Sequence, residues 1–226
     1  MSSSIVYAGP SLANSDVSCC AAINFRPPVR RGDLSAVTRG VSRLLILDGE
    51  FGQSLSVTPK EILRILECGV AVIGAASMGA LRAAELSIFG MTGVGWIYEC
   101  YRSGAIDADD EVALAYDPDT FKPLTVPLVN VRYWARQLAG HGALDRKNQA
   151  KMIRIARRIF FAERSTRLLL RELARAFGEN AIQKFLEITN GVITDIKRFD
   201  AEAALTVLKR DPTSIVAQQR TVNRTN

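Results

Sequence analysis

The sequence predicts an α/β fold: an N-terminal three-layer parallel-sheet (Rossmann-like) core, followed by an all-helical C-terminal half. Short apolar runs that end in turn residues alternate with helix patterns in the first half, as they do in parallel sheets buried on both faces. From residue 129 to residue 209 the pattern favours helix, and no strand is predicted there. The 226 residues fit one large domain or two small ones, and the 48% hydrophobic composition excludes a disordered chain.

The ends of the elements follow from cap residues, glycine and proline. The predicted strands are residues 4–8, 43–47 and 71–74. The predicted helices of the first half are residues 34–38, 59–68, 77–89 and 95–102, followed by an acidic loop at 107–111 and extended segments within 112–126. Those of the second half are residues 144–163, 166–177, 181–188 and 201–209. We therefore predict an α/β core at 1–126, a helical region at 127–212 and a flexible polar tail at 213–226.

Charge is distributed unevenly along the chain. The formal net charge is +6, but residues 1–126 hold 10 Lys and Arg against 14 Asp and Glu, whereas residues 127–226 hold 19 against 9. Two basic stripes fall at helical spacing: Lys147, Lys151, Arg154 and Arg158, then Arg164, Arg167, Arg171 and Arg175. They suit an acidic partner or a plain solvated face. Without a nucleic-acid motif or interleaved aromatic residues, they do not predict nucleic-acid binding.

Several classes of protein are excluded by composition. No apolar run approaches the roughly 20 residues of a membrane-spanning helix, and the first residues lack the basic start of a signal peptide. We therefore expect a soluble, cytoplasmic protein without a membrane partner. The four cysteines form no Cys-x-x-Cys pair and the chain has one histidine, so we expect no metal site and no cofactor.

Three loops should meet at one edge of the predicted sheet, because ligands of open parallel sheets bind outside the carboxyl ends of the strands. The loops contain Gly9 and Ser11 after the first strand, Asp48 and Glu50 after the second, and residues 74–80 after the third. Gly9, Ser11 and Glu50 are candidate substrate-binding residues. This edge is the predicted functional site.

The third loop indicates nucleophilic chemistry. Ser77 lies on a strand-to-helix turn in the pattern Ala75-x-Ser77-x-Gly79, close to the Gly-x-Ser-x-Gly of serine hydrolases. The backbone N–H groups near Met78 and Gly79, at the start of the helix, would form an oxyanion site. The alternative is that Ser77 only caps the helix.

The base that such a serine requires is less evident. His141 falls in a helix-ending loop outside the sheet, where a basic side chain suits a helix C-terminus. Lys60 and Asp48 lie at the same sheet edge as Ser77 and, with Ser11 and the candidate catalytic residue Arg82, are the candidate supporting groups, although each could be an ordinary surface or turn residue. Arg82 and Glu85 could orient a substrate or simply pair with each other.

The string Gly74-Ala-Ala-Ser-Met-Gly-Ala-Leu-Arg-Ala-Ala-Glu-Leu86 resembles the core of the TfuA family. The shorter motifs that accompany it in order are Gly9-Pro-Ser-Leu12, Arg31-Gly-Asp-Leu34, Leu47-Asp-Gly49, Lys60-Glu-Ile-Leu63 and Asp110-Glu-Val-Ala113. The resemblance covers roughly residues 5–126. The chain departs from the family pattern at Pro59, where histidine is expected, at Glu50, where an aromatic residue is expected, and in residues 13–27, which are short for a full helix and strand.

The resemblance implies a partner of YcaO enzymes in the thioamidation of ribosomal peptides, a class of peptide natural products (RiPPs). Proteins of this family are implicated in sulfur transfer: they hydrolyse the C-terminal thiocarboxylate of a ubiquitin-like sulfur carrier, and a precursor peptide is a possible further partner. That acyl transfer suits an exposed serine with an oxyanion site, so residues and resemblance agree on Ser77. The alternative function is a non-catalytic adaptor that docks YcaO or the carrier.

Overall fold

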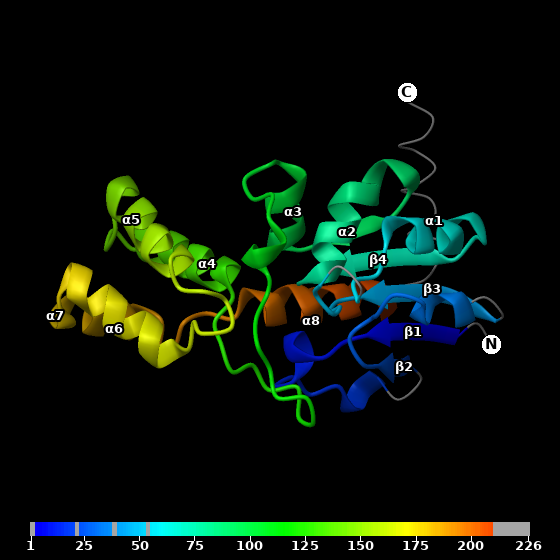
Figure 1. The fold of residues 1–226 in the computed structure, drawn as a ribbon, viewed down its shortest axis with the longest axis horizontal. Helices are drawn as coiled ribbons and strands as arrows, with labels where there is room; N and C mark the ends of the chain where they lie inside the picture. Colours follow the sequence, from blue (N-terminus) through cyan, green and yellow to red (C-terminus); the bar gives the residue numbers. More distant parts are fainter. Residues whose placement is uncertain (1–2, 21–22, 38–39, 53–54, 210–226) are drawn as a thin grey trace. The chain divides into compact units, whose positions relative to one another are not determined.

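The computed structural model describes residues 3–20, 23–37, 40–52 and 55–209 (Figure 1). Contacts divide the chain into two compact units. The first joins the residues up to 107 with those from 197 onward, and the second comprises residues 108–196. These limits differ from the predicted regions 1–126 and 127–212, chiefly because the last helix returns to the first unit. The predicted tail at 213–226 lies outside the described residues.

The first unit contains a five-stranded parallel sheet in the order β2-β1-β3-β4-β5. Its strands are β1 (Ser3–Tyr7), β2 (Ile23–Arg26), β3 (Val41–Ile46), β4 (Ala71–Ala75) and β5 (Thr92–Val94). The predicted parallel sheet is confirmed, and the three predicted strands are β1, β3 and β4. Ile46 of β3 lies opposite Tyr7 of β1 and Gly74 of β4, so these three strands end side by side.

The helices of this unit begin where local chemistry predicts. Its elements are η1 (Pro10–Leu12), η2 (Ser18–Cys20), η3 (Asp33–Ala36), α1 (Pro59–Glu67), α2 (Met78–Leu86), η4 (Ser87–Phe89), α3 (Trp96–Arg102) and α8 (Ile196–Lys209). Thr58 and Glu61 form a reciprocal capping box before α1, with Pro59 at the first position. The helix predicted at 34–38 is instead the short 3-10 turn η3, within the described residues.

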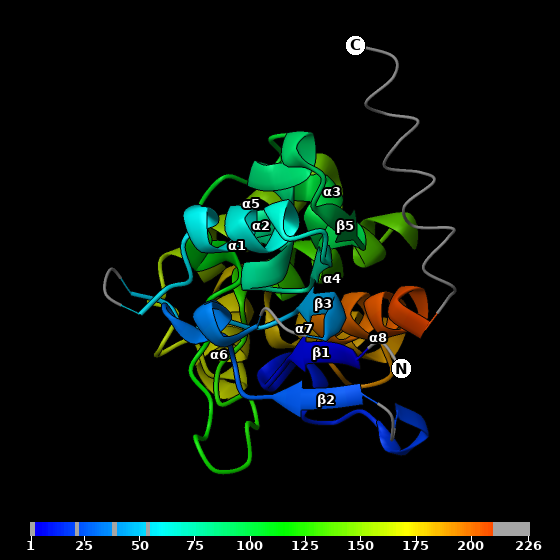
Figure 2. The same cartoon turned by 90° about the vertical axis from the view of Figure 1, so that its right-hand side faces the viewer.

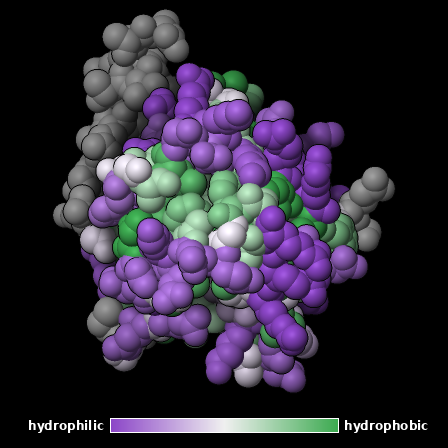
Figure 3. All heavy atoms as spheres, turned by 90° about the vertical axis from the view of Figure 1, so that its left-hand side faces the viewer, coloured by the Kyte–Doolittle hydropathy of each residue, from purple (hydrophilic) through white to green (hydrophobic). Residues whose placement is uncertain are grey.

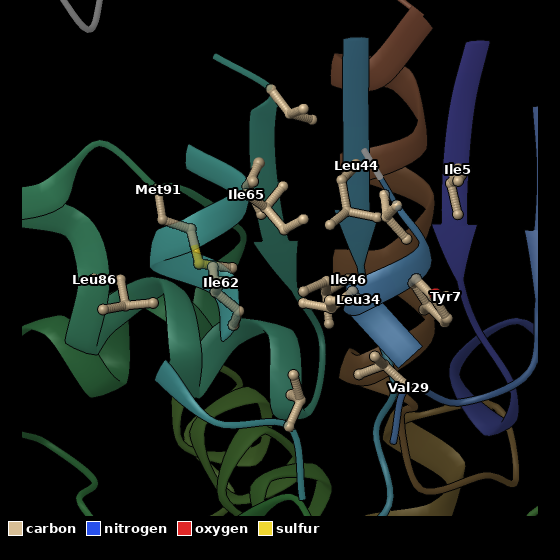
Figure 4. Close-up of a cluster of buried hydrophobic side chains, with 14 of the residues drawn as sticks. Ile5, Tyr7, Val29, Leu34, Leu44, Ile46, Ile62, Ile65, Leu86 and Met91 are labelled. Carbon is tan, nitrogen blue, oxygen red and sulfur yellow. The ribbon is translucent and has the colours of Figure 1, made fainter. Parts of the chain in front are cut away.

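The sheet is covered on both faces, which gives the predicted three layers (Figure 2). On one face Leu44 and Ile46 pack with α1 and α2 in a core that Figure 4 shows in detail. On the other face Leu45 and Leu47 pack against α8. Successive side chains of β3 therefore alternate between two apolar layers, as a fully buried strand requires.

The second unit is helical. It contains η5 (Asp109–Glu111), α4 (Leu128–Gly140), α5 (Arg146–Arg157), α6 (Thr166–Phe177) and α7 (Glu179–Ile188). Its core surrounds the buried Trp134, whose ring meets Phe185 edge to face at 6.4 Å. Asp145 and Ser165 cap α5 and α6, although α5 ends earlier than the predicted residue 163. The structure describes all of residues 112–126, and the extended segments predicted there pair only through the bridge between Tyr116 and Pro123.

Candidate functional site

The candidate site lies at the carboxyl edge of the sheet in the first unit. In the order β2-β1-β3-β4-β5 the chain reverses direction across the sheet between β1 and β3. Ligands of doubly wound sheets bind outside such a switch point. The loops after β1 and β3 are the two that flank it. The structure therefore brings two of the three predicted loops to the position that the topology favours.

Asp48 is the centre of this switch point. Its carboxylate is buried, and Oδ2 accepts hydrogen bonds from the backbone N–H of Gly9 at 2.9 Å and of Ser11 at 3.0 Å. Oδ1 accepts from the Ser11 hydroxyl at 2.7 Å. The Lys197 ammonium lies 3.8 Å from the same oxygen. A carboxylate held by three donors and one cation is fixed in place, which suits a positioning role better than proton transfer.

Ser77 follows β4 on a strained turn. Its N–H donates to the carbonyl of Ala75 at 2.7 Å, which closes a γ-turn with Ala76 at φ 66°. A non-glycine residue at positive φ in such a turn is rare and costs about 1–3 kcal/mol, and this strain gathers at functional sites. The turn takes the chain directly from the strand into α2. It has the strand–turn–helix form predicted from the sequence, with the strained residue one position before the serine.

The Ser77 hydroxyl does not cap α2. Ser77 occupies the N-cap position, yet within the described helix its side chain accepts no hydrogen bond from the first turn. Thr58, Asp145 and Ser165 all make that bond at the starts of their own helices. The capping alternative for Ser77 therefore lacks the hydrogen bond that defines it. The serine is buried, at 2% exposure, so the expectation of an exposed serine is wrong.

Gly79 allows α2 to lie directly on the end of β3. A Cβ atom at this position would come within 1.8 Å of the Ile46 carbonyl oxygen. The Gly79 N–H donates to the Leu47 carbonyl at 3.2 Å, so it is not available for the predicted oxyanion site. The Met78 N–H makes no hydrogen bond to another described residue. Of the two predicted oxyanion donors, the Gly79 N–H is thus engaged, and the Met78 N–H is not engaged within the described residues.

The remaining predicted residues do not converge on Ser77 through contacts. Arg82 donates to the Val57 carbonyl at 3.1 Å and pairs with Glu85 at 2.6 Å, which is the simple i, i+3 pair considered from the sequence. Glu50 lies 3.3 Å from Arg30. Lys60 is exposed in the first turn of α1. These side chains join α1, α2 and neighbouring loops instead of forming one cluster.

Lys197 is the site residue that sequence reasoning missed. It lies at the start of α8, 2% exposed, far along the chain from the strands. The apolar stripe of α8 that packs on the sheet comprises Ala201, Ala204, Leu205 and Leu208. Lys197 and Asp200 fall on the same stripe at helical spacing. Two charged residues in line with this apolar stripe were the signal that could have found them.

The comparison with protein families agrees with the resemblance noted above. Residues 48–165, just over half of the chain, match the family model described as TfuA-like protein. The chain belongs to the TfuA-like family. Membership gives it an accessory role in thioamidation, a role that involves partner proteins. No match was found among curated proteins.

The family match crosses both units. It begins at Asp48, includes Ser77, and continues through α4 and α5, beyond the residues 5–126 to which the sequence motifs pointed. Within it, Glu111 of the Asp110–Ala113 motif is fully buried and accepts hydrogen bonds from Arg132 at 2.6 Å and 2.7 Å and from Arg157 at 2.7 Å. This motif therefore holds η5 to α4 and α5 and has a structural role in the TfuA-like chain.

Asp200 has a similar structural role in the first unit. Its carboxylate accepts hydrogen bonds from the N–H groups of Trp96 at 2.9 Å and Ile97 at 2.8 Å, at the start of α3. Burial raises the pKa of Asp200 to about 6, against the lowering effect of those two hydrogen bonds. Asp200 thus links α8 to α3, as Lys197 links α8 to the loop after β3.

The helical unit exposes a basic surface. Residues 146–177, which include α5 and α6, hold 10 Lys and Arg against 2 Asp and Glu. The exposed members on the two helices are Arg146, Lys147, Arg154, Arg157, Arg167, Arg171 and Arg175. Arg164 is not part of this surface: it is 1% exposed and donates to the carbonyls of Val126, Ala156 and Ile159. The predicted second stripe is therefore wrong at Arg164, which precedes α6.

A shallow groove of about 500 Å³ lies beside this surface. Leu170 and Ala174 of α6 and Ile182 and Leu186 of α7 supply its apolar lining. Figure 3 shows a face of the molecule where hydrophobic surface is bordered by hydrophilic side chains.

Among the described residues no helix is both long and apolar enough to cross a membrane. In that same part of the chain, no three His, Cys, Asp or Glu side chains are grouped to hold a metal ion.

Proposed function

We propose that this chain hydrolyses the C-terminal thiocarboxylate of a ubiquitin-like sulfur carrier and releases sulfide for a YcaO enzyme that thioamidates a ribosomal peptide. The observation that carries the proposal is the turn at Ser77. Its serine hydroxyl stands at the N-terminus of α2 after a strained γ-turn and does not cap that helix. A hydroxyl positioned in this way is suited to attack a carbonyl carbon.

The proposed reaction has two steps. Oγ of Ser77 attacks the thiocarboxylate carbonyl carbon, and the C–S bond breaks to give an acyl ester and hydrosulfide. Water then attacks the ester, which releases the carrier as a carboxylate, restores Ser77 and gives one proton to solvent. The N–H of Met78 and the N-terminus of α2 would stabilise the oxyanion of each tetrahedral intermediate. The reaction as written requires only water.

The basic surface of α5 and α6 supports a docking role for the helical unit. Its exposed arginine and lysine side chains favour an acidic face on the carrier or the YcaO enzyme. The same surface also supports the alternative function, an adaptor that docks these partners without chemistry. The two functions differ at Ser77, because an adaptor has no use for an uncapped hydroxyl at the edge of the sheet.

The test is sulfide release from a thiocarboxylated carrier, measured for the wild type and for Ser77→Ala. The proposal predicts turnover by the wild type and a loss of at least about 10³-fold in Ser77→Ala, since removing a nucleophile costs several orders of magnitude. Ser87→Ala is the matched control, because Ser87 ends the same helical segment and bonds to the Ala84 carbonyl. Wild-type rates in Ser77→Ala would overturn the proposal. Thioamidation supported equally by both proteins, without sulfide release, would favour the adaptor.

A further inference from the structure

Lys197 is a buried cation beside the candidate site. Its side chain is 3% exposed, and Nζ lies 3.8 Å from Oδ1 of Asp48. Burying an ammonium group is costly unless it is paired, and buried lysines serve as general bases in enzymes. The loop that carries Asp48 also contacts the turn that carries Ser77: the Gly79 N–H donates to the Leu47 carbonyl, and a Cβ on Gly49 would lie 2.9 Å from Cγ of Met78.

The other basic and acidic groups at this edge are engaged elsewhere. Arg82 is bound to Val57 and Glu85, and a guanidinium does not give up its proton in proteins. Lys60 is exposed on α1, and both oxygens of Asp48 accept hydrogen bonds. His141 belongs to the other unit. Tyr7, at the end of β1, is also buried, and its hydroxyl donates to the Asp33 carbonyl and accepts from Arg26. Lys197 is thus a buried group beside Asp48 that can both give and take a proton.

We propose that Lys197 carries the proton of the reaction at Ser77, an assignment that rests on the proposed function. The Lys197 ammonium gives a proton to the sulfur of the thiocarboxylate anion and becomes a neutral amine. The amine takes the proton of Ser77 as Oγ bonds to the carbonyl carbon. The C–S bond then breaks, and the sulfur leaves as hydrosulfide with the first proton. Asp48 is the positioning residue that holds the ammonium between steps.

The experiment measures two rates: sulfide release from the carrier, and covalent labelling of Ser77 by a small fluorophosphonate, which does not need the carrier. Lys197→Met removes the proton carrier. Lys197→Arg keeps a positive charge opposite Asp48, which protects the fold, but cannot release a proton at neutral pH. Lys184→Met, at an exposed position of α7, is the matched control. Thermal unfolding of each variant shows whether it is folded.

In both Lys197 variants we expect each of the two rates, labelling of Ser77 and release of sulfide, to be at least 100-fold lower than in the wild type. Lys184→Met should match the wild type in both rates. The pH profile separates proton transfer from a structural role: the labelling rate of folded Lys197→Arg should depend on pH differently from that of the wild type. Wild-type labelling rates in a folded Lys197 variant, or no labelling of Ser77 in the wild type, would overturn the assignment.

The two proposals fail in different ways. If the wild type labels at Ser77 in a Lys197-dependent manner but releases no sulfide, the proposed function is wrong and the Lys197 assignment stands. If the wild type releases sulfide through Ser77 and the Lys197 variants do so equally fast, the Lys197 assignment is wrong and the proposed function stands.

Discussion

The hydroxyl of Ser11 donates a hydrogen bond of 2.7 Å to Oδ1 of Asp48, and this bond joins the loops that follow β1 and β3. Both residues are buried, at 1% and 3% exposure. The neighbouring N–H groups of Gly9 and Ser11 bind the other carboxylate oxygen, so the short 3-10 turn after β1 is organised by one aspartate. Because three donors and Lys197 surround this one carboxylate, its removal should destabilise both loops at the switch point.

Asp48→Ala should lower the free energy of unfolding by about 3–5 kcal/mol, because it leaves the buried Lys197 without its carboxylate and removes the acceptor of three donors. Asp48→Asn should cost less, since the amide keeps one acceptor oxygen. Chemical denaturation measures both. Asp107→Ala, at an exposed position, is the control and should change stability by less than about 0.5 kcal/mol. A loss as small as the control's in Asp48→Ala would contradict the buried network.

Ser77→Ala should leave the stability nearly unchanged, within about 0.5 kcal/mol, because the hydroxyl does not cap α2. Thr58→Ala is the contrasting variant. It removes a capping box that the structure contains, and should cost about 1 kcal/mol. Urea denaturation of the two variants gives the comparison. Equal losses for both would mean that Ser77 caps its helix after all.

Asp200 should make stability depend on pH in the direction opposite to most carboxylates. Its pKa is about 6 in the folded chain against 3.8 for the ordinary group, so the folded state binds the extra proton between these values. The stabilising contribution is complete below about pH 4 and is lost as the pH rises through 6, by up to about 3 kcal/mol. Between pH 4 and 7, the free energy of unfolding of the wild type should therefore fall relative to that of Asp200→Asn as the pH rises. A constant difference would contradict the raised pKa.

Arg164→Met should destabilise the helical unit by about 3 kcal/mol, because the carbonyls of Val126, Ala156 and Ile159 lose their buried donor. Burial also lowers the pKa of the Arg164 guanidinium. Arg167→Met is the matched control on the exposed face of α6 and should be nearly neutral. Denaturation curves distinguish the two arginines. Equal losses of stability in the two variants would contradict the buried position of Arg164.

Sequence reasoning succeeded where a feature depends on neighbouring residues. The Thr58 cap of α1, the Ser165 cap of α6 and the strand–turn–helix at Ser77 are all local features, and the structure contains each of them. The alternation of strand and helix predicted a parallel sheet, and hence the edge at which the loops after its strands lie. β2 escaped prediction because its residues are only partly buried and give no continuous apolar run.

What sequence reasoning missed depends on the return of α8 to the sheet. In its described residues, the segment between β1 and β2 contains 3-10 turns and no α-helix, and α8 covers that face of the sheet. The return brings Lys197 to Asp48 and Asp200 to α3, over 149 and 103 residues of chain. Helical spacing likewise placed Arg164 on a surface stripe, but it precedes the first residue of α6 and turns inward. These contacts are long-range, so local sequence patterns do not identify their partners.

The proposed hydrolysis through Ser77 is tested most directly by looking for the acyl ester on this residue. The wild type is mixed with a stoichiometric amount of thiocarboxylated carrier, quenched in acid within one turnover, and digested for mass spectrometry. We expect a peptide in which Ser77 is joined through an ester to the C-terminal residues of the carrier. This adduct should be absent from Ser77→Ala. Sulfide release at the wild-type rate from Ser77→Ala, with no adduct on Ser77 in the wild type, would contradict the proposed hydrolysis.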